Sequence, residues 1–454
     1  MAPRRVAFAP LVLAVLVVFG VRGHASGGPS GPHQVILFIG DGMGLPQITL
    51  GRLAAERLER PYSFDRFDTM GLASTRSANH VVTDSAAAAT AISSGYKTNN
   101  GFLGMDPSKH ARRTIMEVAH AKGVATGLVT TCRITDATPA GFASHVEDRW
   151  KEDEIAADEA ASGIDVLMGG GRKFWKGGRL DAMKKRGYEV ATDVKELRAA
   201  KLDGKLLGLF NDEHMDYDIE RDPSREPSLR EMTERAIDLL GRGGRSFLLL
   251  VEGGKIDHAG HYHDAPAMVR DQLALADAID AALERVERQG DLLVLVTGDH
   301  TTGGVGITDT MDVDGLLAAK CSAQRFTAVH KPAEFTASLD AFSRVVSDEY
   351  GFAPTATDLD FVRKANNKDY EAVRLGHVVS ERRGVEFFSV EHQQTYQTIT
   401  HGHEGSLVPV LAAGRGKASF VGVYENARIG LEIARLMGLP APGDPLTEPA
   451  KRFF

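Results

Sequence analysis

The 454-residue chain has few cysteines and no excess of basic residues, features that define disulfide-rich and nucleic-acid-binding proteins. Its only cysteines are Cys132 and Cys321, which excludes a disulfide-rich scaffold and leaves one bridge or two free thiols. Basic residues are not in excess, because 53 Lys and Arg face 61 Asp and Glu for a formal charge of -8, so we expect no nucleic acid partner. Hydrophobic residues at 43% and charged residues at 25% are typical of a globular protein rather than a disordered or fibrous one.

One apolar run, from Val6 to Val21, approaches the length of a membrane-spanning segment. It follows Arg4 and Arg5 and precedes Gly23-His24-Ala25, which has small residues three and one positions before a cleavage point. The pattern predicts a secretory signal peptide over residues 1–25, followed by a flexible amino terminus over residues 26–33; a membrane anchor is the alternative. We therefore expect an exported protein, periplasmic or secreted, without a stable membrane anchor after cleavage.

Short, nearly unbroken apolar runs alternate with helical patterns along the rest of the chain. The expected strands are 34–39, 124–130, 164–168, 247–251, 292–296 and 408–412, and the expected helices are 84–94, 114–122, 152–162, 228–240, 265–288 and 425–437. Alternation of this kind predicts an α/β fold: a three-layer sandwich with a mostly parallel central sheet between helices. Residues 34–454 are expected to form one domain, with a polar, mostly helical insertion or cap at about 307–400.

Polar side chains follow four of the expected strands, at the point where each strand ends. They are Asp41; Asp136 and Thr138; Glu252 with Asp257 and His261; and Asp299 with His300. A single acid in such a place is most often a helix cap or turn former. Ligands of open α/β sheets bind at the carboxyl ends of the strands, however, and several carboxylates can share a buried cleft only when cations neutralise them.

The ligand types indicate which cations to expect. Imidazole mixed with carboxylate suits Zn²⁺, and this type comprises Asp257, His261, Asp299, His300 and either His401 or His403. Oxygen ligands alone suit Mg²⁺, and Asp41, Glu252 and Thr138 supply them. The sequence therefore predicts two zinc-type sites beside a third, harder site.

Ser85 begins a second candidate feature, in the segment Thr83-Asp84-Ser85 that precedes an alanine run. Alanine strongly favours helix, so Ser85 is expected in the first helical turn, with Thr83 or Asp84 as the cap. A helix amino terminus stabilises anions, and a serine there beside a metal ion could attack phosphorus. The alternative is a plain helix start in which Ser85 has no chemical role.

Together these segments resemble the alkaline phosphatase family. The similar stretches are Asp41-Gly42-Met43-Gly44, 82–90, 95–101, 251–261, 297–301 and 403–410, and they run in family order over most of the chain. The resemblance implies hydrolysis of phosphate monoesters through a phosphoserine on Ser85, with two Zn²⁺ and one Mg²⁺ as cofactors. It also implies small-molecule phosphate monoesters as the binding partners, and a homodimer as the assembly common in the family.

The resemblance further assigns a role to each site residue. It implies Asp257, His261 and His403 for the first zinc ion; Asp41, Asp299, His300 and Ser85 for the second; and Asp41, Thr138 and Glu252 for magnesium. Arg149 resembles the arginine that binds the phosphoryl oxygens, while Asp136 and His258 are positions that vary in the family and surround the magnesium ligands. His403 is preferred to His401 because its spacing to Val408-Pro409 matches the family pattern.

Two other functions remain open at this point. A relative with the same metal ligands could act on phosphodiesters or sulfate esters, although Arg149 argues against a diesterase and the segment around Ser85 against a sulfatase. A secreted metal-binding protein without catalysis would keep the Asp and His residues but would have no need for Ser85 or Arg149.

Overall fold

The structure is a computed structural model that describes residues 31, 33–395 and 399–444. The expected signal peptide and the expected flexible amino terminus, apart from residues 31 and 33, lie outside these residues. Among the described residues, no helix combines the length and the apolar content that a membrane crossing requires.

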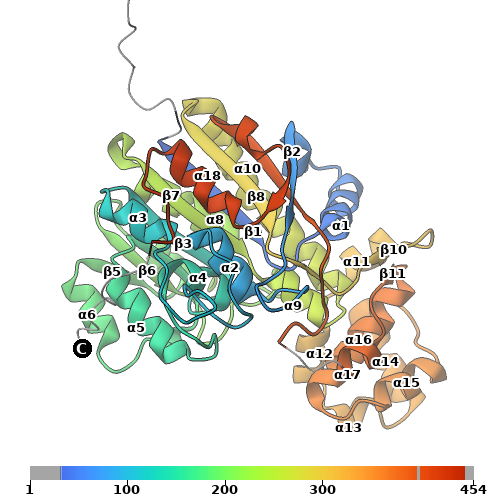
Figure 1. The fold of residues 1–454 in the computed structure, drawn as a ribbon. Helices are drawn as coiled ribbons and strands as arrows, with labels where there is room; N and C mark the ends of the chain where they lie inside the picture. The colour runs from blue at the N-terminus through green and yellow to red at the C-terminus, as the bar shows by residue number, and fades with distance from the viewer. Residues whose placement is uncertain (1–30, 32, 396–398, 445–454) are drawn as a thin grey trace, which may run out of the picture. The chain divides into compact units, whose positions relative to one another are not determined.

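A ten-stranded sheet forms the centre of the described chain (Figure 1). Its strands, in spatial order, are β14 (Gly422–Glu425), β2 (Thr69–Ser74), β13 (Val408–Gly414), β8 (Leu292–Gly298), β1 (Gln34–Gly40), β7 (Phe247–Gly253), β3 (Ala125–Arg133), β4 (Val166–Gly170), β6 (Lys205–Leu209) and β5 (Tyr188–Ala191). Only β13 runs antiparallel to its neighbours β2 and β8 within this sheet. The prediction of a mostly parallel sheet is confirmed.

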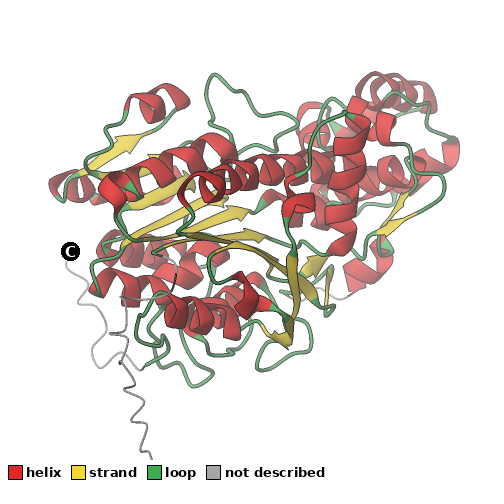
Figure 2. Ribbon diagram, turned by 90° about the horizontal axis from the view of Figure 1, so that it is seen from above, coloured by secondary structure: helices red, strands yellow, loops and turns green. Residues whose placement is uncertain are grey.

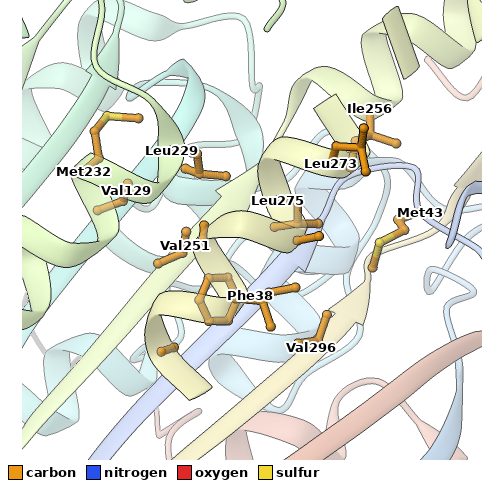
Figure 3. Close-up of a cluster of buried hydrophobic side chains, with 14 of the residues drawn as sticks. Phe38, Met43, Val129, Leu229, Met232, Val251, Ile256, Leu273, Leu275 and Val296 are labelled. Atoms are coloured by element: carbon orange, nitrogen blue, oxygen red, sulfur yellow. The ribbon is translucent and has the colours of Figure 1, made fainter. Parts of the chain in front are cut away.

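Side chains of the central strands are buried on both faces of the sheet, which explains their unbroken apolar sequences. In β1, Ile36 and Phe38 point into one core, and Val35, Leu37 and Ile39 into the other. The first core includes residues of α1 (Leu45–Arg57), α7 (Val194–Ala199), α8 (Leu229–Leu240), α9 (Lys255–His261) and α10 (Ala265–Gln289). Figure 3 shows part of this core, with residues of α8, α9 and α10 labelled. The second packs against α2 (Ser85–Ser94), α3 (Ile115–Ala121), α4 (Ala137–Ala143), α5 (Glu152–Ser162), α6 (Arg179–Lys185) and α18 (Arg428–Leu436). Figure 2 shows the resulting helix–sheet–helix layers.

Most of the expected insertion is helical. It contains α11 (Val313–Ala318), α12 (Ala323–Val329), α13 (Pro332–Phe335), α14 (Leu339–Tyr350), α15 (Ala356–Arg363), α16 (Lys368–Arg382) and α17 (Val390–Thr395), most of which lie together in Figure 1. A third apolar core around Phe326, Phe342 and Tyr350 holds α12 to α16 together, whereas Leu316 of α11 packs into the first core. Two short ladders flank them: β10 (Gly306–Ile307) with β11 (Val385–Glu386), and β9 (Thr301–Thr302) with β12 (His403–Glu404).

Candidate active site

The central strands end in register at one edge of the sheet. Gly40 of β1 lies opposite both Gly253 of β7 and Gly298 of β8. Asp41 and Asp299, the next residues after β1 and β8, therefore leave the sheet at the same level. Glu252 is the penultimate residue of β7, and the short helix α9 that follows β7 carries Asp257 and His261 one turn apart.

Asp41, Asp299 and His300 form one group of candidate metal ligands. Nε2 of His300 lies 3.4 Å from Oδ1 of Asp41 and 3.3 Å from Oδ2 of Asp299. Oδ1 of Asp299 accepts hydrogen bonds from the backbone N–H groups of Gly42 and His300. Asp41 Oδ1 and Asp299 Oδ2 are buried and accept no hydrogen bond, so both oxygens are available to a cation.

Asp257, His261 and His403 form a second group. His261 Nε2 lies 3.2 Å from Oδ2 of Asp257 and 3.1 Å from Nε2 of His403. His403 arrives from far along the chain through the β12–β9 ladder, in which it pairs with Thr302. Its Nδ1 lies 3.0 Å from the carbonyl oxygen of Thr83, which can only accept, so Nδ1 carries the hydrogen and Nε2 keeps its lone pair. The His401 ring lies near that of His261, with centroids 4.8 Å apart and planes tilted by 38°, but His401 is not one of this group.

Thr302 connects the two groups. Its buried hydroxyl donates to Oδ1 of Asp257 and lies 3.2 Å from Nδ1 of His300. Because the hydroxyl hydrogen is used by the carboxylate, the oxygen accepts the Nδ1 hydrogen of His300. This contact leaves Nε2 of His300, which faces Asp41 and Asp299, in the form that binds a metal ion.

The oxygen-type residues Asp41, Thr138 and Glu252 are all buried. Thr138 Oγ1 has no hydrogen bond, whereas Glu252 accepts one from the hydroxyl of Thr130. Burial raises the pKa of Glu252 to about 8. Burial, followed by the charges of Asp299, Asp257 and Glu252, also holds the pKa of Asp41 well above its ordinary value. Without cations these carboxylates would favour protonation, so the donor set fits the ions that the sequence predicts.

Ser85 is the first residue of α2, and the preceding Asp84 caps this helix by accepting from the N–H of Ala87 at 3.0 Å. Ser85 Oγ lies 3.2 Å from Nε2 of His300, which places the hydroxyl beside the first ligand group. Ser85 also lines a cavity of about 550 Å³ together with Arg149, Trp150 and other residues. A small molecule entering this cavity can therefore reach the hydroxyl.

Arg149 is held beside Ser85 by two carboxylates. Its Nη1 donates to Asp84 Oδ2 and its Nη2 to Asp136 Oδ1, both at 3.2 Å. Burial raises the pKa of Asp136, but the neighbouring His214 and the charged side chains of Arg149 and Arg133 hold it below the ordinary range, so Asp136 stays ionised. Each Nη carries two hydrogens, so one hydrogen on each remains for an anion in the cavity.

The sequence did not indicate several residues that support this site. Asp84 was expected only as a helix cap, yet it also orients Arg149. Thr302 and Thr130, which contact the ligand carboxylates, are ordinary strand threonines in the sequence. His214, which lies 3.6 Å from Asp136, follows no strand that the apolar pattern predicted. Only the tertiary structure brings these four side chains to the site.

Comparison with known proteins identifies relatives over most of the chain. The family model described as alkaline phosphatase matches residues 33–439. Alkaline phosphatase 4 of Bacillus subtilis is 32% identical over 418 residues, covering 87% of this chain and 86% of that protein.

Solved structures agree with the sequence comparison. The alkaline phosphatase of Thermus thermophilus superposes with a TM-score of 0.81 at 27% identity, covering 92% of this chain and 96% of that one. A variant of the alkaline phosphatase from the Antarctic bacterium TAB5, described with magnesium bound in its M3 site, superposes with a TM-score of 0.66 at 28% identity. That alignment covers 91% of this chain and 99% of the other.

Proposed function

Because this chain belongs to the alkaline phosphatase family and hydrolyses phosphate monoesters, we propose that Ser85 is its nucleophile and Arg149 the residue that binds the phosphoryl group. The observation that carries this proposal is the position of Ser85 Oγ, 3.2 Å from His300 in a cavity that Arg149 also lines. Enzymes of this family depend on metal ions, and the site described above supplies the ligands.

We assign the metal ligands residue by residue. Asp257, His261 and His403 hold one Zn²⁺; Asp41, Asp299, His300 and Ser85 hold a second; Asp41, Thr138 and Glu252 hold Mg²⁺. The buried oxygens without hydrogen bonds on Asp41, Asp299 and Thr138 support this assignment, as does magnesium in the TAB5 relative. When bound, such ions stabilise negative charge on the attacking, transferring and leaving oxygens of an in-line displacement.

Ser85 carries the covalent step in this proposal. Its Oγ loses its proton to solvent and forms a bond to phosphorus while the bond from phosphorus to the alcohol oxygen breaks, and the departing oxygen takes up a proton from solvent. Water then attacks the phosphoserine, which releases inorganic phosphate and restores the hydroxyl of Ser85. The amino terminus of α2 favours the anion at Ser85 through its partial positive charge.

Arg149 selects the substrate class. Asp84 and Asp136 fix its guanidinium plane, so the remaining Nη hydrogens can bind two phosphoryl oxygens at once. A dianionic monoester offers three non-bridging oxygens, whereas a diester offers two. Asp136 therefore contributes by positioning Arg149, and His258, which lines the same cavity, contributes to the polar wall.

The nucleophile can be tested with Ser85→Ala. We expect turnover of a chromogenic phosphate monoester to fall by roughly 10³-fold or more, and acid-quenched enzyme to carry no phosphoryl group. Zinc content should change far less than turnover, because most ligands remain. The matched control is Ser94→Ala at the other end of α2, where the hydroxyl donates to the carbonyl of Thr90. Phosphorylation of the Ser85→Ala protein would overturn the assignment.

We also propose export, to the periplasm or the medium, directed by residues 1–25. The basic, apolar and small-residue pattern of this segment supports the proposal. Mass spectrometry of the protein recovered from outside the cytoplasm should find Ser26 as the first residue. A mature chain that still begins at Met1 would contradict it.

A further inference from the structure

Four side chains with metal-binding atoms converge beside the site described above, and none of them is among the metal ligands assigned there. Cys132, Asp136, His214 and His258 each offer one ligand atom, and these atoms all lie within 4.8 Å of one another. Cys132 comes from the end of β3, Asp136 caps α4, His214 lies in the connection between β6 and α8, and His258 belongs to α9. The fold thus brings four separate segments to one point.

The spacing of the donors fits a tetrahedral ion. Cys132 Sγ lies 3.6 Å from Nε2 of His258, and Asp136 Oδ2 lies 3.6 Å from Nδ1 of His214. Zinc bond lengths of about 2.3 Å to sulfur and about 2.0–2.1 Å to nitrogen, at tetrahedral angles, separate S and N by roughly 3.5 Å. These two spacings match tetrahedral coordination, and the remaining donor pairs lie within 4.8 Å of each other.

Both imidazoles are in a neutral form. Nδ1 of His214 accepts from the backbone N–H of Arg133 at 3.2 Å, and an imidazolium has no acceptor. Nδ1 of His258 lies 3.3 Å from Nζ of Lys255, whose ammonium only donates. Neither ring therefore opposes a cation with its own charge. Because both Nδ1 atoms face hydrogen-bond donors, each neutral ring carries its hydrogen on Nε2. Coordination through Nε2 requires that this hydrogen move to Nδ1 and that the ring give up its contact with Arg133 or Lys255.

The Cys132 thiol fits into the packing around it, and an ion can reach the four side chains through the cavity. Cys132 is buried, while Asp136, His214 and His258 line the cavity that contains Ser85. A Cβ at position 254 would lie 2.5 Å from Cys132 Sγ, so the sulfur reaches the cluster only because this residue is glycine. The backbone of Gly254 has φ −75°, which any residue adopts, so its conformation does not explain the glycine.

We propose that Cys132, Asp136, His214 and His258 bind a thiophilic divalent cation such as Zn²⁺, as a site separate from the ligand groups assigned above. The Cys132 thiol loses its proton to solvent when the ion binds. Four protein ligands fill a tetrahedral shell, so this ion is structural and does not take up substrate. It fixes one oxygen of Asp136 while the other holds Arg149.

Cobalt substitution tests the proposal, because this cluster contains sulfur whereas the ligand groups around Ser85 supply only nitrogen and oxygen. The metal-free full-length protein is titrated with Co²⁺ and its near-ultraviolet spectrum recorded. We expect a sulfur-to-cobalt charge-transfer band that persists in the matched control Cys321→Ser and is absent from Cys132→Ser. No such band in the wild-type protein, or a band that Cys321→Ser removes, overturns the proposal.

Metal content provides the second measurement. His214→Ala keeps the thiol and should bind the cluster's ion at least about 10-fold more weakly, with loss of one zinc equivalent per chain after dialysis and weakening of the cobalt band. Unchanged zinc content and an unchanged band in His214→Ala would exclude His214 and with it the four-ligand site. Phosphatase activity is not the readout, so failure here is distinct from failure of the Ser85 assignment.

Discussion

At the carboxyl edge of the sheet, several buried side-chain oxygens lack hydrogen-bond partners, whereas polar side chains that begin the inserted helices pair with near neighbours in the sequence. Asp41 Oδ1, Asp299 Oδ2 and Thr138 Oγ1 accept or donate no hydrogen bond. In the insertion, Ser322, Ser338, Thr355 and Asn367 each cap the helix that follows them. The first arrangement needs a ligand from outside the chain, and the second needs none.

The difference shows how unpaired polar groups identify a functional site. Leaving a buried oxygen without a hydrogen bond costs about 1–3 kcal/mol, and more when it is charged. A protein therefore keeps several such oxygens in one place only where something else binds them. In the inserted helices, polar side chains at the helix starts accept hydrogen bonds from nearby backbone N–H groups, and these caps stabilise the helices.

Removal of metal ions should have the largest effect and should separate the two regions. Chelation is expected to abolish turnover and to lower Tm, because the crowded carboxylates lose their counter-charge. Hydrogen exchange should speed up around Asp41, Asp299 and α9 but not in α14 to α16. Recovery of activity on adding Zn²⁺ with Mg²⁺ is the control; full turnover in the chelated protein would contradict the metal assignment.

Thr302→Val removes the hydroxyl that contacts both ligand groups. We expect it to lower turnover less than removal of the metal ions does. Loss of an outer contact of this kind lowers metal affinity or activity by about 10–100-fold. Thr126→Val is the matched control, because its buried hydroxyl on β3 has no partner and its loss should be neutral. Equal zinc affinity and equal kcat in Thr302→Val and wild type would show that the Thr302 hydroxyl is not needed to orient His300 and Asp257.

Glu159 is a third case: its buried carboxylate is neither one of the candidate metal ligands nor a helix cap. We therefore expect it to make the stability of the protein depend on pH. It is buried on α5 without hydrogen bonds, and burial, then the charges of Glu152 and Asp158, holds its pKa well above the ordinary 4.5. As pH rises, Glu159 therefore loses its proton in the unfolded chain at a lower pH than in the folded protein. The free energy of unfolding falls as pH rises above about 4.5, by up to about 1.4 kcal/mol per pH unit.

Glu159→Gln abolishes this proton release. The difference in Tm between variant and wild type should therefore grow in favour of the variant from pH 5 to pH 9. Glu154→Gln, at a partly exposed position of the same helix, is the control and should show no such trend. A constant difference across this range would mean that Glu159 is ionised in the folded protein.

Thr355→Ala should have the smallest effect, confined to the insertion. The Thr355 hydroxyl accepts from the N–H of Asp358, and the Asp358 carboxylate accepts from the N–H of Thr355. Losing this cap should lower the free energy of unfolding by about 1 kcal/mol, measured by denaturant titration, with kcat unchanged. Thr357→Ala, an exposed position on the same helix, is the control; a loss of activity in Thr355→Ala would show that the insertion is coupled to the chemistry.

Much of the fold could be predicted because the central strands are buried on both faces. The strings around Phe38, Leu249 and Leu295 are unbroken, and each became a strand of the sheet. Strands β2 and β14 at the far edge were missed because their residues alternate between buried and exposed or lie largely exposed. Helix α1 was missed because two of its buried positions, Gln47 and Gly51, are not apolar side chains and so weaken its periodic pattern.

The candidate ligands were predicted unevenly, for a physical reason. Asp41, Asp299 and Glu252 sit at or beside the ends of apolar strands, so a rule about strand ends finds them. His403 depends on a two-residue ladder that no periodicity reveals, and only family spacing distinguished it from His401. Asp84 has two roles, and its local one as a cap concealed its contact with Arg149.

The ladder between β9 and β12 has a consequence for how this architecture can vary. Residues 303–402 leave and return at adjacent points, since Thr302 pairs with His403 and Gly303 donates to the carbonyl of Gly402 at 2.8 Å. Closing such an excursion costs only about 0.6 kcal/mol more for each doubling of its length. Chain closure therefore places little constraint on the length of the excursion, whereas the ladder at its two ends holds His403 beside His300.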